Sequence, residues 1–168
     1  MKFEHLNFIK ILEEALEPNI DVISLACKYR SKFEGWLKFE ILRNLHKKGL
    51  VVTPEGERFD ILINYIGIKY AIELKTVNMN YRISGIESKR KPVTKNFKSI
   101  EKDIEKIENS AVPGKVIFII FPIPAGDESF KKFIEKVQDK TGFSIKQKFL
   151  KINSDYEVVL CESEVIKS

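Results

Sequence analysis

Three ionisable residues, Asp60, Glu73 and Lys75, have the types and the spacing for metal-assisted chemistry at a phosphate group. Twelve residues separate Asp60 from the triplet Glu73-Leu74-Lys75. Two carboxylates suit Mg²⁺, which proteins hold through one or two carboxylates while water and substrate phosphate take the other positions. A lysine beside such an ion can orient the attacking water, accept its proton or offset negative charge on phosphorus. The pattern therefore predicts hydrolysis of a phosphate ester.

The triplet lies in a predicted strand, which distinguishes it from a second acid-x-Lys triplet, Glu87-Ser88-Lys89, in a predicted loop. Residues 59–65 and 68–75 both alternate with a period of two, which is typical of β-strands. Ile66-Gly67 between them predicts a tight turn, and hence a hairpin. Charged side chains in a half-buried strand are costly unless they are paired or bind a metal, so the hairpin is where we expect a site.

The position of the turn sets which residues face each other. With the turn at Ile66-Gly67, Asp60 faces Glu73 and Arg58 faces Lys75, whereas a bulge at the glycine would shift the register by one residue. Facing carboxylates repel by about 0.2–1 kcal/mol, and more when buried, and a divalent cation between them removes that cost. Lys75 projects to the same face as Glu73. We expect burial to lower the pKa of Lys75 toward neutrality, which would suit a proton acceptor.

Several other chemistries are excluded by the residue inventory. Cys27 and Cys161 are far apart and form no CxxC motif, so we expect buried free thiols. The two histidines, His5 and His46, are too few for a typical zinc site or a Ser-His-Asp triad. Gly114-Lys115 is followed by valine, which rules out a phosphate-binding P-loop. The candidate chemistry is thereby narrowed to carboxylates and lysines.

The positive charge of the chain is concentrated in one segment. The net charge is +5, and residues 76–98 carry six basic residues and one acid, which accounts for all of it. A long polar loop at 76–93 is predicted there, and loops of this length are commonly functional. A local basic excess suits a nucleic acid, with a solvated loop as the alternative. The expected nucleic-acid-binding residues are Tyr81, Arg82, Lys89, Arg90, Lys91, Lys95 and Lys98.

The remaining pattern predicts an α/β fold in one domain. Helical spacing predicts helices at 5–17, 21–28, 31–48, 94–109 and 127–140. Strands are expected at 50–52, 59–65, 68–75, 116–121, 143–152 and 156–161. The continuous apolar run 116–121 suits a central strand covered on both faces. We expect an N-terminal helical segment at 1–30, an αβββαβ core at 31–121 with a mixed sheet flanked by helices, and a C-terminal αββ extension at 122–168.

At these residues the sequence resembles the PD-(D/E)xK nuclease superfamily, which has the restriction-endonuclease-like fold. The resemblance covers residues 34–121. It implies that Asp60, Glu73 and the backbone carbonyl of Leu74 hold Mg²⁺ or Mn²⁺, and that Lys75 acts in catalysis. It also implies a glutamate on the helix before the sheet, for which Glu34 is our candidate. No proline precedes the aspartate here, since residue 59 is phenylalanine.

Glu34 has two interpretations. Its neighbours at i+3, i+7 and i+11 are Leu37, Ile41 and Leu45, which puts it on the apolar side of its helix, facing the sheet. Glu40 lies on the solvated side instead. The stretch 31–34 also matches a capping box, in which Glu34 would only close the N-terminus of the helix.

The expected function is that of a metal-dependent deoxyribonuclease, an endonuclease or an exonuclease. The alternatives are an inactive nucleic-acid-binding module of the same fold and a protein–protein module. DNA is the expected partner, with RNA and homodimerisation left open. No apolar run is long enough for a membrane span and no signal-peptide core is found, so we expect a cytoplasmic protein.

Overall fold

A six-stranded mixed sheet forms the centre of the protein, in a computed structural model that describes residues 6–88 and 92–165. The strand order is β1-β2-β3-β4-β6-β5. The first three strands form an antiparallel meander, β4 runs parallel to β3, and β6 and β5 continue antiparallel. The strands are β1 Val51–Pro54, β2 Ile61–Tyr65, β3 Ile68–Asn78, β4 Gly114–Pro124, β5 Ile145–Lys151 and β6 Tyr156–Val165.

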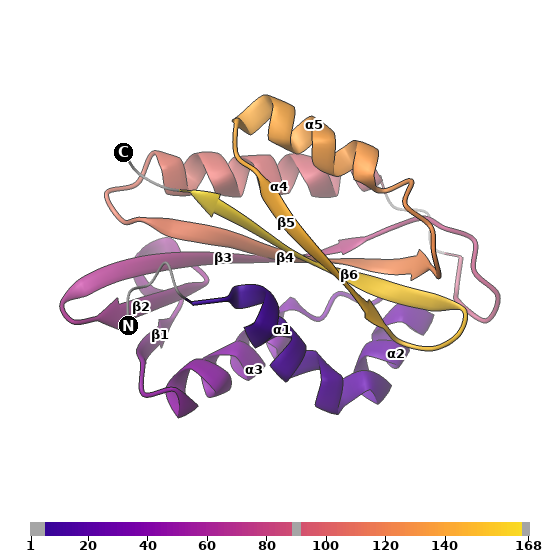
Figure 1. The fold of residues 1–168 in the computed structure, drawn as a ribbon, viewed down its shortest axis with the longest axis horizontal. Helices are drawn as coiled ribbons and strands as arrows, with labels where there is room; N and C mark the ends of the chain where they lie inside the picture. The colour runs from indigo at the N-terminus through magenta and orange to yellow at the C-terminus, as the bar shows by residue number, and fades with distance from the viewer. Residues whose placement is uncertain (1–5, 89–91, 166–168) are drawn as a thin grey trace.

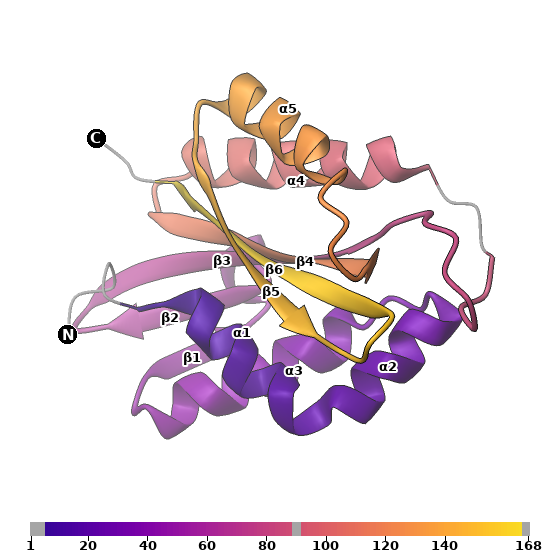
Figure 2. The ribbon, with the colours of Figure 1, turned by 45° about the vertical axis from the view of Figure 1, so that its right-hand side comes forward.

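Helices cover both faces of this sheet (Figure 1, Figure 2). One face carries α1, α2 and α3, and the opposite face carries α4 and α5. Their bounds are α1 Phe8–Leu16, α2 Ile20–Tyr29, α3 Glu34–Lys47, α4 Val93–Glu108 and α5 Lys131–Thr141, with short 3₁₀ helices at Glu17–Asn19 and Gly56–Arg58. The expected α/β class and element order are confirmed. None of these helices in the described part of the chain is long and apolar enough to cross a membrane.

Strand β4 is the core of the sheet. Val116, Phe118 and Ile120 pack toward α4 and α5, while Ile117 and Ile119 pack toward the other helical layer. All five are fully buried, because the strand is covered on both sides as its apolar run predicted. Both cysteines are buried free thiols, also as expected.

Helix α3 begins later than the sequence pattern predicted. It starts at Glu34 rather than at residue 31, and its N-cap residue, Phe33, makes no side-chain capping bond. The predicted capping box is therefore wrong. Arg30 explains the difference, since it adopts a left-handed conformation that ends α2, and the chain needs residues 31–33 to turn toward the sheet.

Strand β3 is longer than predicted and runs on to Asn78, because parallel pairing with β4 continues as far as Asn78 opposite Phe121. The connection to α4 is therefore shorter than the predicted loop at 76–93. Its start is anchored by the buried Arg30 side chain, which donates to the carbonyls of Met79, Tyr81 and Glu87. These bonds tie the first part of the connection to the end of α2.

Candidate functional site

The hairpin that carries the candidate residues has the expected register. Ile66 and Gly67 both have positive φ, which forms the predicted two-residue turn. Ile61 pairs with Ile72, so one further step along the strands puts Asp60 across from Glu73. The bulge that would have shifted this register is not formed in the β2–β3 pairing.

The second predicted pair, Arg58 with Lys75, is wrong. Arg58 ends the 3₁₀ helix Gly56–Arg58 and has φ 73°, so the chain leaves the strand direction before it reaches Lys75. The carbonyl of Arg58 instead accepts a hydrogen bond from Lys106 of α4. The loop before β2 thus turns its backbone toward α4, on the face where Glu73 lies.

Asp60 is held in place by the backbone of β3. Its Oδ2 accepts the N–H of Leu74 at 2.8 Å, beyond the last paired residues of β2 and β3. The Asp60 carboxylate therefore accepts a hydrogen bond from the β3 backbone at a point where β2 supplies no backbone carbonyl. The bond fixes Asp60 next to the triplet, and its charge is close enough to affect both Glu73 and Lys75.

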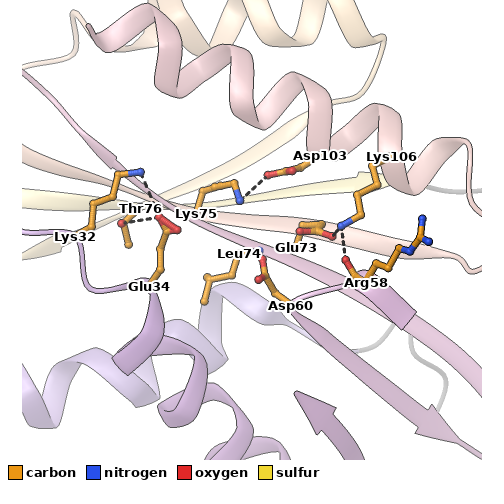
Figure 3. A network of polar contacts seen from close by, with 10 residues as sticks. All are labelled: Lys32, Glu34, Arg58, Asp60, Glu73, Leu74, Lys75, Thr76, Asp103 and Lys106. Atoms are coloured by element: carbon orange, nitrogen blue, oxygen red, sulfur yellow. Dashed lines mark hydrogen bonds and ion pairs between the residues drawn. The ribbon is translucent and has the colours of Figure 1, made fainter. Parts of the chain in front are cut away.

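Glu73 is a buried acid, with only 3% of its surface exposed. Burial raises its pKa to about 7, and the charges of Asp60 and Asp103 push in the same direction against a hydrogen bond from Lys106. Lys106 of α4 makes an ion pair with the Glu73 carboxylate (Figure 3). Glu73 thus exchanges its proton near neutral pH, and a cation already lies on one of its oxygens.

Lys75 lies two residues further on and points to the same side of the sheet, toward α4 (Figure 3). Its Nζ is 3.2 Å from Oδ2 of Asp103. Burial lowers the pKa of Lys75, but the charges of Asp103, Asp60 and Glu34 together outweigh burial, and the net pKa is raised. Our expectation of a pKa near neutrality is therefore wrong, because the carboxylates around Lys75 stabilise its ammonium form.

Glu34 reaches β3 from the first turn of α3. Its Oε1 accepts from the Thr76 hydroxyl at 3.3 Å and lies 3.4 Å from Nζ of Lys32. Thr76 alternates with Lys75 along the strand, so Glu34 approaches from the face opposite to α4 (Figure 3). The residues below it on the helix, Leu37 among them, are fully buried as predicted.

Asp103 and Lys106 are the two site residues that the sequence analysis did not find. Both come from α4, each directly before an apolar residue of its buried stripe, Ile104 and Ile107. The sequence did contain a signal for these two residues, because a helix that connects two parallel neighbouring strands packs back onto the sheet. Charged residues next to the stripe of such a helix face the strand that carries the triplet.

The residues expected to bind nucleic acid are only partly together. The Tyr81 hydroxyl makes a hydrogen bond with the Ser129 hydroxyl at 2.7 Å, in which either group can donate, so it already has a partner at this exposed position. Arg82 is exposed on the connection to α4, whereas Lys95 and Lys98 lie along α4 itself. Residues 89–91, which include three of the predicted contacts, lie outside the described residues.

The sequence matches no protein-family model, no curated protein and no solved structure. In the described residues there is no group of three or more His, Cys, Asp and Glu side chains that could hold a metal ion. Any metal at this site would therefore rest on the Asp60 and Glu73 carboxylates, with backbone carbonyls, water and substrate as its other ligands.

Proposed function

We propose that the protein hydrolyses phosphodiester bonds in DNA and that a divalent metal ion, Mg²⁺ or Mn²⁺, assists the reaction. The observation that carries the proposal is the grouping of Asp60, Glu73 and Lys75 at the end of one hairpin. The αβββαβ order and the β1-β2-β3-β4 arrangement support a restriction-endonuclease-like core for residues 31–121. No comparison with known proteins contributes to this assignment.

The carboxylates fit such an ion by their chemistry. Mg²⁺ prefers oxygen ligands and binds through as few as one or two carboxylates. The second oxygen of Asp60 takes no hydrogen bond from the described part of the chain. Glu73 already accepts a positive group, the ammonium of Lys106, whose side chain is 39% exposed on a flexible stem and can move aside.

Asp60, Glu73, Lys75 and Asp103 would each have a distinct role in the reaction. A bound divalent ion supplies a lowered water pKa and offsets charge on the phosphate. Asp60 and Glu73 hold that ion, and the raised pKa of Lys75 keeps this side chain as a donor. Lys75 therefore orients the water or donates to a phosphate oxygen, rather than accepting the proton. Asp103 holds the Lys75 ammonium in position.

A second candidate is a nucleic-acid-binding module that does not cleave. The ion pair between Lys106 and Glu73 favours it, because the buried carboxylate is already neutralised from inside the protein. The nuclease proposal has the advantage of giving a role to Lys75 and to the second carboxylate, Asp60, beside that pair. The two candidates differ in one measurable property, cleavage that depends on a divalent metal.

Cleavage of plasmid, single-stranded and branched DNA with Mg²⁺ or Mn²⁺ tests the proposal. We expect Glu73→Ala to abolish cleavage and weaken metal binding, and Lys75→Ala to abolish cleavage while metal binding is largely kept. Glu135→Ala and Lys136→Ala, at exposed positions on α5, are the matched controls and should cleave like the wild type. Absence of cleavage on every DNA form, with DNA binding retained, would establish the binding module instead.

Glu34→Gln tests whether this residue belongs to the site. The carboxylate is close enough to raise the pKa of Lys75, so its loss should reduce cleavage. An amide keeps the hydrogen bond with Thr76, so the melting temperature should change little. A lower melting temperature with cleavage unchanged would show that Glu34 has a structural role alone.

A further inference from the structure

A groove with a volume of about 380 Å³ lies between the loop that precedes α3 and residues 95–102 of α4. It is lined by four lysines and two small polar residues: Lys32, Lys95, Asn96, Lys98, Ser99 and Lys102. One end adjoins the candidate site, because Lys32 pairs with Glu34 and Lys102 directly precedes Asp103. The groove therefore lies next to Glu34 and Asp103, which contact Thr76 and Lys75 of β3.

The charges in this groove are not balanced within the protein. Lys95, Lys98 and Lys102 form no ion pair with any residue that the structure describes, and no acid is among the described residues that line the groove. Lys95 also lies in the first turn of α4, which contains no acidic residue. A cation at that end opposes the helix dipole. An anion bound here would offset both the mutual repulsion of the lysines and the opposed helix dipole.

The lysines form a continuous stripe along α4. Lys95, Lys98, Lys102 and Lys106 are spaced three, four and four residues apart, which places them on one side of the helix. The stripe begins in the groove and ends at Glu73, the partner of Lys106. Eleven residues of helix cover about 16 Å, a length over which one strand of duplex DNA presents about five phosphates.

We infer that the groove binds the phosphodiester backbone of the substrate strand and leads it along α4 to Lys75. This inference rests on the proposed function for its substrate. The described part of the lining offers ammonium, hydroxyl and amide groups, which contact phosphates, and no aromatic ring on which a base would stack. The groove therefore binds DNA through its charge, with little dependence on base sequence.

The test compares two variants that lose the same number of charges. The groove variant is Lys32→Gln/Lys95→Gln/Lys98→Gln/Lys102→Gln. The control variant substitutes four exposed lysines on other elements, Lys10→Gln/Lys47→Gln/Lys136→Gln/Lys151→Gln. Fluorescence anisotropy with a labelled 20-base-pair duplex, in EDTA to prevent cleavage, gives the dissociation constant at a series of salt concentrations.

We expect the groove variant to bind at least about tenfold more weakly at low salt. The slope of log K against log salt should become shallower by up to about 3.6, since each phosphate contact contributes about 0.9. The control variant should keep a slope close to that of the wild type. Equal slopes for the two variants would overturn the inference. If the groove variant does not fold, the pairs Lys32/Lys102 and Lys95/Lys98 are substituted separately. Each double variant should make the slope of log K against log salt shallower by up to about 1.8.

The inference and the proposed function can fail separately. Wild-type protein that cleaves DNA, with unchanged slope in the groove variant, would overturn only the groove. Wild-type protein that binds DNA through the groove but cleaves nothing with Mg²⁺ or Mn²⁺ would overturn only the nuclease proposal. Wild-type protein that binds no DNA at all would overturn both.

Discussion

Glu73→Gln should make the metal-free protein more stable at alkaline pH, although it removes an ion pair. Burial raises the pKa of this carboxyl from 4.5 to about 7, so the native state holds a proton that the unfolded chain has already released between those values. Where the native state binds more protons than the unfolded state, the free energy of unfolding falls as pH rises. The stabilisation is thus complete below about pH 4.5 and is lost as pH rises through 7.

The magnitude follows from the same two values. A pKa that moves from 4.5 to about 7 corresponds, at 1.36 kcal/mol per pH unit, to a loss of about 3 kcal/mol on ionisation. Lys106 acts against this loss, because its ammonium stabilises the ionised carboxylate of Glu73. Glutamine imitates the protonated carboxyl and does not titrate, so the variant avoids this loss.

Urea unfolding in EDTA at pH 4.5, 6, 7 and 8 measures the effect. The difference in free energy of unfolding, Glu73→Gln minus wild type, should rise by about 2–3 kcal/mol from pH 4.5 to pH 8. Glu135→Gln, at an exposed position on α5, is the matched control and should leave the free energy of unfolding close to that of the wild type. A difference for Glu73→Gln that does not change with pH would refute the argument that burial governs this carboxyl.

Three further predictions concern the neighbours of this carboxyl and the sheet beneath it. Lys106→Met removes the ammonium that competes with a metal at the site, so Mn²⁺ should bind up to about fivefold more tightly in calorimetry; weaker binding would contradict a competing role. Asp103→Asn removes the largest of the charges that raise the pKa of Lys75, so an NMR titration should show that pKa lowered, and an unchanged value would contradict the assignment. Gly114→Ala would bring a Cβ within 2.3 Å of a β3 carbonyl oxygen and should lower the free energy of unfolding by about 1–3 kcal/mol in urea. Its control, Gly35→Ala, meets no atom within 4 Å and should cause no loss.

Local patterns were sufficient for the hairpin and for the strand that supports it. A period of two assigns Glu73 and Lys75 to one face and Ile72 and Leu74 to the other, and burial of the apolar pair follows from that alternation. The two-residue turn then sets the register, because shifting it by one residue would exchange the side chains between the two faces of the sheet. These features depend on residues close together in the chain, and sequence spacing reports them directly.

Interactions between distant segments determined the rest. Lys75 keeps a raised pKa because Asp103 comes back over β3 on the crossover helix and Glu34 arrives from the opposite layer. Lys106 reaches Glu73 for the same reason. The late start of α3 and the extension of β3 to Asn78 likewise depend on Arg30 and on pairing with β4. Electrostatic energy depends on separation in space, so residues some 30 positions apart can reverse the effect of burial on a single lysine.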